Sequence, residues 1–365
     1  MLINGDVSEK IKLIADEYKI KNPLLVCDSY LVKLPVYEKL TSEFPRFSVF
    51  TEFTPNPLYK EVVNGISCFN RNACDSIIAI GGGSALDVAK CIKLYYAVPD
   101  TVHFLSTVVN GNSLPILAIP TTAGTGSEST KFAVIYYNGE KQSVNHDTIL
   151  PDAAVLIPEL LFTLPLYQKK CTMLDALCHA VESYWSVNST VESRKLSAEA
   201  IDEILKCHKD YLSGKESGFS PMLIAANKAG QAINITQTTA AHAMCYKLTS
   251  LYGIPHGYAA ALCLPQIWEY MLDNIEMCCD PRGSAFLSSV LTELGEVFAK
   301  SSMIYGPDTF MGFVRSLSLP DIKGTDADIA ILAGSVNQTR LKNNPVPLSQ
   351  DAIVEIYRQI IERGD

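Results

Sequence analysis

The stretch Ser76-Ile-Ile-Ala-Ile-Gly-Gly-Gly-Ser-Ala-Leu-Asp-Val-Ala-Lys90 contains an apolar run, three glycines and a segment of good helix formers. This order predicts a buried strand, a tight turn and a helix that begins near Ala85. Bare backbone N–H groups and the positive end of the helix dipole would meet at the turn, which suits a pyrophosphate. The stretch matches neither GxGxxG, because Leu86 fills the third glycine position, nor the Walker A pattern. A simple tight connection is the alternative.

Strand and helix patterns alternate on both sides of this stretch. The apolar runs are 23–27, 47–50, 76–80 and 115–119, and the helical patterns are 8–18, 34–41, 58–68 and 85–96. Alternation of this kind predicts a parallel sheet with helices on both faces. Asn138-Gly139, between 133–137 and the polar segment from Lys141, predicts a small hairpin added to that sheet.

Beyond Pro158 the strand-like runs disappear. Helical spacing marks 173–185, 192–206 and 221–239. We therefore expect an α/β plus all-α fold, with a Rossmann-like dinucleotide-binding domain over 1–160 and a helical domain over 161–365.

Composition narrows the class of protein. The chain has 365 residues, 48% of them apolar, a net charge of −9 and eleven cysteines without a CxxC pair. The negative charge disfavours a nucleic-acid partner, and we find no apolar run of the roughly 18 residues that a membrane helix needs and no signal-peptide pattern at the start. Scattered cysteines indicate reduced thiols, so we expect a soluble, cytoplasmic protein with no membrane partner.

A second loop, Pro120-Thr-Thr-Ala-Gly-Thr-Gly-Ser-Glu-Ser-Thr130, also follows an apolar run. Its hydroxyls and glycines would line the same ligand from the other side. A loop capped by its own serines and threonines is the alternative.

Four residues of metal-ligand type lie in the second half. Asp175 and His179 are four apart on one helical face, and His242 lies in another helical pattern. His256 is followed by Gly257, which would let the backbone turn closely around a bound group. Three imidazoles and a carboxylate suit Fe²⁺, Zn²⁺ or Mn²⁺, with no thiolate to favour zinc. The alternative for each histidine is a hydrogen-bonded core residue.

Taken in order, the segments 81–90, 120–128, 175–182, 242–244 and 255–257 resemble the iron-containing (group III) alcohol dehydrogenase family over essentially the full chain. The resemblance implies one divalent metal, Fe²⁺ first and Zn²⁺ second, held by Asp175, His179, His242 and His256. It implies a nicotinamide cofactor held by Asp28, Asn56, Gly82, Gly83, Ser84, Asp87, Thr121, Thr122, Thr125, Thr130 and Lys141. Because Asp28 matches a carboxylate that holds the ribose hydroxyls, we expect NAD(H) over NADP(H). A homodimer is also expected.

Two positions depart from the family pattern. Many members carry a histidine four residues after the third ligand, where this chain has Tyr246, so we assign the proton relay to Tyr246 or to water. Ile157 replaces a usual aspartate, a change that affects packing. The segments 242–257 and 340–345 resemble the phosphonoacetaldehyde reductase branch.

The resemblance therefore predicts hydride transfer between NAD(H) and a small alcohol or aldehyde. Lys247 and Arg340, the latter beside Lys342, Asn343 and Asn344, would bind an anionic head group such as that of phosphonoacetaldehyde. Solvated surface charge is the alternative for these cations. Three other enzymes remain open, a general short-chain alcohol dehydrogenase, a sulfoacetaldehyde reductase and a dehydroquinate-synthase-like lyase, as does a nucleotide-binding protein without catalysis.

Overall fold

The computed structural model describes residues 7–99, 102–300 and 306–362. The chain divides into two compact units. One comprises Met1–Thr122 with Gly126–Leu161, and the other comprises Ala123–Thr125 with Phe162–Asp365. Three residues of the threonine-rich loop thus belong to the second unit, although both their neighbours in sequence belong to the first.

A five-stranded parallel sheet forms the centre of the first unit, as the apolar runs predicted. Its strands lie in the order β2-β1-β3-β4-β7, and every pair is parallel. Their bounds are β1 (Pro23–Cys27), β2 (Ser48–Phe50), β3 (Ser76–Gly81), β4 (Ile116–Pro120) and β7 (Ala153–Ala154). Because β7 has only two residues, it is too short to be predicted from a sequence pattern.

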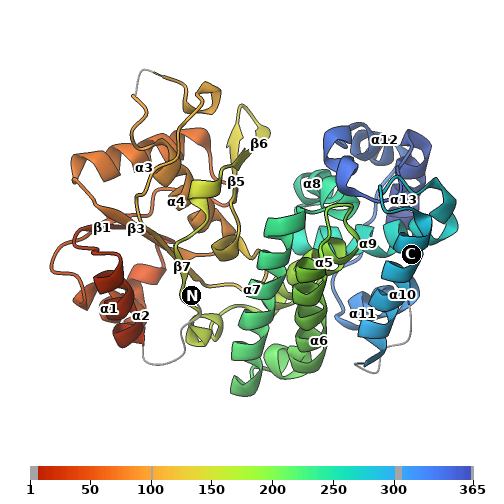
Figure 1. The fold of residues 1–365 in the computed structure, drawn as a ribbon, viewed down its shortest axis with the longest axis horizontal. Coiled ribbons are helices and arrows are strands. Elements are labelled where there is room, and N and C mark those ends of the chain that lie inside the picture. Colours follow the sequence, from red (N-terminus) through yellow and green to blue (C-terminus); the bar gives the residue numbers. More distant parts are fainter. Residues whose placement is uncertain (1–6, 100–101, 301–305, 363–365) are drawn as a thin grey trace. The chain divides into compact units, whose positions relative to one another are not determined.

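Alternate residues of the central strand face opposite layers of helices. Ile77 and Ala79 pack in one buried cluster with the helices α3 (Tyr59–Arg71) and α4 (Gly83–Tyr95). Ile78 and Ile80 pack in the other, with α1 (Val7–Glu17) and α2 (Pro35–Ser42). Figure 1 shows these two helix pairs on opposite sides of the sheet. The period of two along a strand explains why the run is apolar throughout.

The hairpin forms, but it does not extend the parallel sheet. β5 (Phe132–Tyr137) and β6 (Glu140–Asn145) pair antiparallel as a separate two-stranded sheet. The prediction that it joins the main sheet is wrong, because β7 already occupies the edge beside β4.

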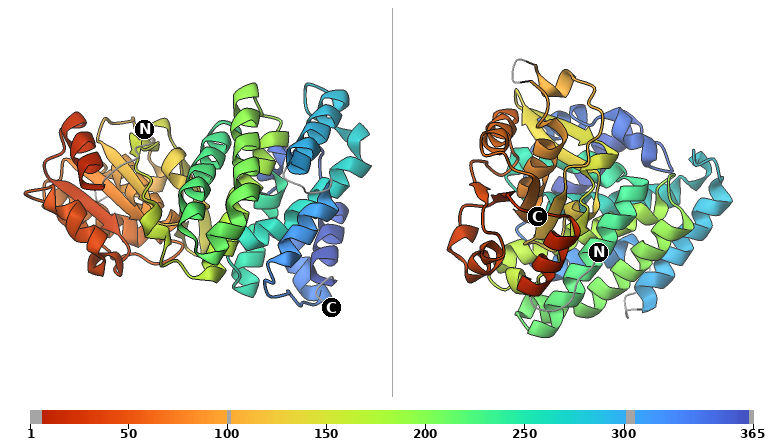
Figure 2. Two further views of the ribbon diagram at one scale, coloured as in Figure 1. Left: turned by 90° about the horizontal axis from the view of Figure 1, so that it is seen from below. Right: turned by 60° about the vertical axis from the view of Figure 1, so that its left-hand side comes forward.

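Helices make up the second unit. They are α5 (Leu166–Trp185), α6 (Val191–Ser213), α7 (Phe219–Thr236), α8 (Ala240–Tyr252), α9 (His256–Asp273), α10 (Ser284–Lys300), α11 (Pro307–Ser316), α12 (Asp326–Gly334) and α13 (Gln350–Glu362), with a 3₁₀ helix, η8 (Gln338–Asn343). Figure 2 shows the long helices α5, α6 and α7, in yellow-green to green, side by side. The described residues of this unit contain no strand, so the α/β plus all-α prediction is confirmed.

One helix is shorter than its pattern predicted. The pattern covered 221–239, but α7 ends at Thr236, because Gln237 adopts a φ of 59° that no α-helix tolerates. Residues 237–239 instead lead into α8. No helix among the described residues is long and apolar enough to cross a membrane.

Candidate functional site

One candidate site lies in the α/β unit, where the strand order of the sheet reverses. From β1 the chain continues to β2 on one side, whereas β3 lies on the other side of β1. Open parallel sheets bind ligands outside the carboxyl ends of the strands at such a point. Asp28 follows β1, and Gly82, Gly83 and Ser84 follow β3, so the structure places these predicted residues beside one another.

Hydrogen bonds hold this corner together. The N–H of Gly82 donates to the carboxylate of Asp28, and the N–H of Asn56 donates to Ser84 Oγ at 3.3 Å. A Cβ on Gly81 would lie 2.9 Å from Asp28 Oδ2 and 2.5 Å from Ala85 Cβ, so only glycine lets the three segments meet. Burial raises the pKa of Asp28, and the Gly82 hydrogen bond partly opposes this shift.

The helix after the glycines begins earlier than the sequence predicted. α4 starts at Gly83 rather than near Ala85, with Gly82 as its N-cap. Gly83 and Ser84 therefore stand in the first turn, where backbone N–H groups have no partner within the helix. This arrangement suits a pyrophosphate at the helix N-terminus.

The threonine-rich loop lies next to the glycines. The N–H of Thr121 donates to the carbonyl of Gly81 at 3.0 Å, and Thr122 Cγ2 lies 3.6 Å from where a Cβ of Gly82 would stand. Thr125 belongs to the helical unit. Thr130 is buried and accepts a hydrogen bond from Lys90 at 3.2 Å.

A buried lysine, which sequence reasoning did not single out, ties this loop to α4. Lys90 Nζ donates to Ser127 Oγ and to the Phe132 carbonyl, each at 2.8 Å. Asp87 accepts from Ser127 Oγ and from the Val134 N–H, each at 3.0 Å. Burial lowers the pKa of Lys90 to about 8 despite the opposing charge of Asp87.

Two predicted cofactor residues, Asp87 and Lys141, lie in the electrostatic surroundings of the buried Lys90. Burial raises the pKa of Asp87, and the charges of Lys90 and, more weakly, of Lys141 on β6 oppose this shift. Asp87 therefore holds the loop after β4 and the start of β5 against α4.

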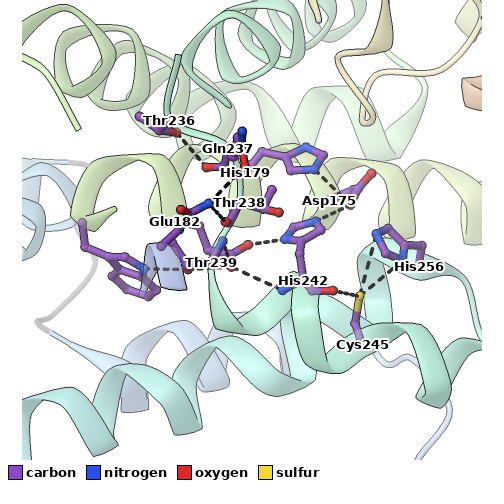
Figure 3. A network of polar contacts seen from close by, with 12 residues as sticks. Asp175, His179, Glu182, Thr236, Gln237, Thr238, Thr239, His242, Cys245 and His256 are labelled. Atoms are coloured by element: carbon purple, nitrogen blue, oxygen red, sulfur yellow. Dashed lines mark hydrogen bonds and ion pairs between the residues drawn. The ribbon is translucent and has the colours of Figure 1, made fainter. Parts of the chain in front are cut away.

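A separate candidate site lies within the helical unit, where three helices bring their polar side chains together. Asp175 comes from α5, His242 from α8, and His256 is the first residue of α9. Each offers a ligand atom within 4.8 Å of the others. Figure 3 shows the three side chains gathered in one place. His242 Nε2 lies 3.3 Å from Asp175 Oδ1, close to the roughly 3.0–3.4 Å expected between two ligands about 2.1 Å from one ion.

His179 stands beside this group rather than within it. Its Nε2 lies 3.9 Å from Asp175 Oδ1, and its ring stacks on that of His242 with centroids 4.4 Å apart. His179 Nδ1 lies 3.3 Å from the carbonyl oxygen of Gly124. The structure therefore brings all four predicted ligand residues to one place, three of them with ligand atoms within 4.8 Å of one another.

The electrostatics favour a bound cation. Burial would raise the pKa of Asp175, but His179, the hydrogen bond from His242 and the charge of His256 hold it below its usual range. Burial would lower the pKa of His242, but Glu182 and Asp175 raise it to about 9. Asp175 and Glu182 are 4% and 0% exposed, so two carboxylates lie in one buried site. The set of donors, imidazole nitrogen and carboxylate oxygen, fits a divalent transition metal.

A stack of side chains extends from this site. The ring of Tyr246 stacks on that of His256 with centroids 5.1 Å apart, and the guanidinium of Arg340, on η8, lies 4.8 Å from the Tyr246 ring. Burial raises the pKa of Tyr246, so its hydroxyl stays protonated at neutral pH. The other cation, Lys247, is half-buried and makes no side-chain hydrogen bond or ion pair within the described part of the chain.

The two asparagines near Arg340 have structural partners. Asn343 donates to the carbonyl of Thr238 at 3.2 Å, and Asn344 donates to that of Val346 at 2.7 Å. Lys342 is exposed. Of the polar cluster at 340–344, Arg340 is the residue that reaches the stack on His256.

Comparison with known proteins agrees with this geometry. A family model described as "Iron-containing alcohol dehydrogenase" matches residues 1–158, and "Fe-containing alcohol dehydrogenase family, C-terminal" matches residues 170–361. The chain belongs to the iron-containing alcohol dehydrogenase family. This membership favours net oxidation or reduction of alcohols and aldehydes over the lyase alternative.

Relatives within the iron-containing alcohol dehydrogenase family differ in substrate. The probable alcohol dehydrogenase EutG of Escherichia coli K12 is 30% identical, over 93% of this chain and 87% of that protein. Phosphonoacetaldehyde reductase of Streptomyces viridochromogenes is 31% identical, over 76% of this chain and 74% of that protein. The crystal structure of sulfoacetaldehyde reductase from Bifidobacterium kashiwanohense with NAD⁺ superposes with a TM-score of 0.86 at 27% identity, covering 99% of this chain and 96% of that chain.

Sequence reasoning missed the residues that surround the histidines of this dehydrogenase. Glu182, on α5, lies against His242, and Cys245 Sγ lies 3.3 Å from His256 Nδ1. The available signal was a carboxylate seven residues after Asp175 on the same helical face of an apolar segment. Cys245 carried no signal, because nothing distinguishes it from the other buried cysteines.

The glycine after His256 has a different role from the predicted one. A Cβ on Gly257 would overlap the carbonyl oxygen of Cys171 and lie 2.5 Å from Asp175 Cβ. Gly257 thus allows α9 to approach α5 closely, rather than letting the chain turn around a ligand.

We predict that Gly257→Ala separates α9 from α5, lowers stability by about 1–3 kcal/mol and reduces the metal content. Gly312→Ala on α11 is the matched control, because a Cβ there meets nothing within 4 Å. Urea unfolding and metal analysis of both variants provide the measurement. Wild-type metal content and stability in Gly257→Ala would show that the helix contact does not constrain the site.

Proposed function

We propose that this chain is an NAD(H)- and iron-dependent dehydrogenase that reduces a small aldehyde with an anionic head group, phosphonoacetaldehyde first and sulfoacetaldehyde second. The observation that carries the proposal is the convergence of Asp175 and His242, both buried, with the half-buried His256 from three helices. Family membership supplies the class of reaction.

The roles of the residues follow from their chemistry. Asp175 and the three histidines would hold the ion, and the first-turn N–H groups of Gly83 and Ser84 would bind the pyrophosphate. When bound, the metal polarises the carbonyl oxygen and the nicotinamide supplies or accepts the hydride. Tyr246 would pass a proton as a neutral hydroxyl, since its raised pKa disfavours a phenolate base.

His256→Ala and Asp175→Asn should each abolish metal binding and lower kcat by at least about 1,000-fold, because the ligands come together only in the folded chain. His208→Ala on α6 is the control, since its Nδ1 lies 2.8 Å from the Leu205 carbonyl oxygen and away from the cluster. Metal analysis of anaerobically purified protein, kinetics and circular dichroism provide the readouts. Full metal content with normal turnover in either ligand variant would remove the assignment.

The cofactor preference should depend on Asp28. Its carboxylate stands at the carboxyl end of β1, where it would accept the ribose hydroxyls of NADH and repel a 2′-phosphate. We expect the wild type to favour NADH by roughly 10- to 100-fold in kcat/KM, and Asp28→Asn to reduce this preference.

Asp16→Asn, an exposed carboxylate on α1, changes the net charge equally and should leave the preference unchanged. Equal efficiency with NADPH in the wild type would show that Asp28 does not face the ribose.

The proposed substrate class rests on Arg340. Its guanidinium is half-buried and lies one aromatic ring away from the candidate ligand His256. A guanidinium binds two oxygens of a phosphonate or sulfonate through its planar fork, an interaction that an alkyl aldehyde cannot make. The names of two relatives, phosphonoacetaldehyde reductase and sulfoacetaldehyde reductase, agree with this class.

A general short-chain alcohol dehydrogenase is the second candidate. The relative named probable alcohol dehydrogenase EutG supports it. In that case Arg340 would serve only to cover the Tyr246 ring.

Kinetics with phosphonoacetaldehyde and propanal, with sulfoacetaldehyde alongside, separate the two candidates. We expect Arg340→Ala to lower kcat/KM for phosphonoacetaldehyde by about 30- to 1,000-fold and to change that for propanal little, because a charge-assisted contact is lost. Lys247→Ala should act in the same direction, and Lys342→Ala, an exposed cation on the same 3₁₀ helix, is the control. If propanal is the better substrate and no variant alters the preference, the anionic-substrate proposal is wrong.

A further inference from the structure

Each candidate ligand histidine has a partner at Nδ1, and in His179 and His242 the other nitrogen, Nε2, is the one toward Asp175. Nδ1 of His179 faces a carbonyl, that of His242 a carboxylate and that of His256 a thiol. A metal-binding histidine usually donates its other N–H to such a partner, which fixes the tautomer and orients the ring. Among the three partners, the carboxylate of Glu182 is the strongest acceptor.

Glu182 uses its two oxygens for different purposes. Oε1 accepts from the Thr239 N–H at 3.0 Å, from Thr239 Oγ1 at 2.7 Å and from the His242 N–H at 3.3 Å, which caps the N-terminus of α8. Oε2 meets His242 Nδ1 (Figure 3). The side chain is 0% exposed, so water cannot replace either set of contacts.

We propose that Glu182 is a positioning residue for the metal, which holds His242 as the Nδ1–H tautomer and directs the Nε2 lone pair toward Asp175. This inference rests on the proposed metal site. It explains why Nε2 of His242, and not Nδ1, is the atom at 3.3 Å from Asp175 Oδ1.

Charge balance provides a second argument. Asp175 and Glu182 place two carboxylates in one buried site, and imidazoles that bind a metal do so in the neutral form and add no charge. A divalent ion neutralises this pair, whereas an uncompensated charge in the interior is costly. Glu182 therefore favours a divalent over a monovalent ion without contacting the metal.

The substitution Glu182→Gln separates the two roles of this side chain. An amide offers one acceptor oxygen in place of the two carboxylate oxygens. If that oxygen keeps the three contacts at the start of α8, the amide NH₂ faces His242 Nδ1 and forces the proton onto Nε2, toward the metal position. Glu182→Gln should therefore preserve the helix cap and impair metal binding.

The test is Co²⁺ titration of chelator-treated, full-length protein under anaerobic conditions, followed by visible absorption. We expect Glu182→Gln to weaken Co²⁺ binding by about 10- to 100-fold. Thr239→Val is the matched control, because it removes the 2.7 Å hydrogen bond to Oε1 and leaves Oε2 unchanged. It should lower the urea midpoint while Co²⁺ affinity stays within about threefold of wild type.

Two outcomes overturn the inference: affinity of Glu182→Gln within about threefold of wild type, or equal weakening by Thr239→Val. The metal site itself requires that the wild type binds one Co²⁺ and that His256→Ala does not. If either result is not found, the metal site is refuted rather than the role of Glu182. A measurement on wild type alone covers the case in which Glu182→Gln does not fold. In Zn²⁺-loaded protein labelled with ¹⁵N-histidine, His242 should carry its proton on Nδ1, and a proton on Nε2 would overturn the proposal.

Discussion

Two buried carboxylates on one helix constrain the helical unit. Asp175 and Glu182 lie on α5 and are almost fully removed from water, so each needs donors or a cation nearby. His242 serves both, with one ring nitrogen toward each carboxylate. The start of α8 is therefore fixed against α5, and Gly257 lets α9 approach the same helix at the level of Asp175. The same contacts therefore form the polar site and determine how these three helices pack.

The α/β unit has an analogous buried charge in Lys90. Its ammonium holds Ser127, Thr130 and Phe132, so the loop after β4 is tied to the helix that follows the glycines. Charged groups thus set loop positions in this unit, while the alternating faces of the strands supply the core. Asp28 completes the corner through the Gly82 N–H.

Local patterns in the sequence predicted the sheet and the helices well, because strand and helix periods are properties of short segments. β7 was not predicted, because a strand of two residues is too short to show a periodic pattern. The hairpin was assigned to the wrong sheet, because the order of strands depends on tertiary packing rather than on local sequence. Within the candidate site, the four-residue spacing of Asp175 and His179 is visible in the chain, but their proximity to His242 and His256 depends on how three helices pack. Glu182 lies in a segment that the sequence singled out, but its role depends on the contact between its carboxylate and His242 Nδ1, which only the structure shows.

The helical unit includes three residues from a loop that lies far before its main segment in the sequence. Ala123–Thr125 belong to the helical unit although they lie within the loop of the α/β unit, and the carbonyl of Gly124 faces His179. A fragment cut at the sequence boundary near residue 162 would lack that carbonyl. The helical half is therefore not a self-contained cassette, and a chimaera that takes its catalytic helices from this protein must also inherit the threonine-rich loop.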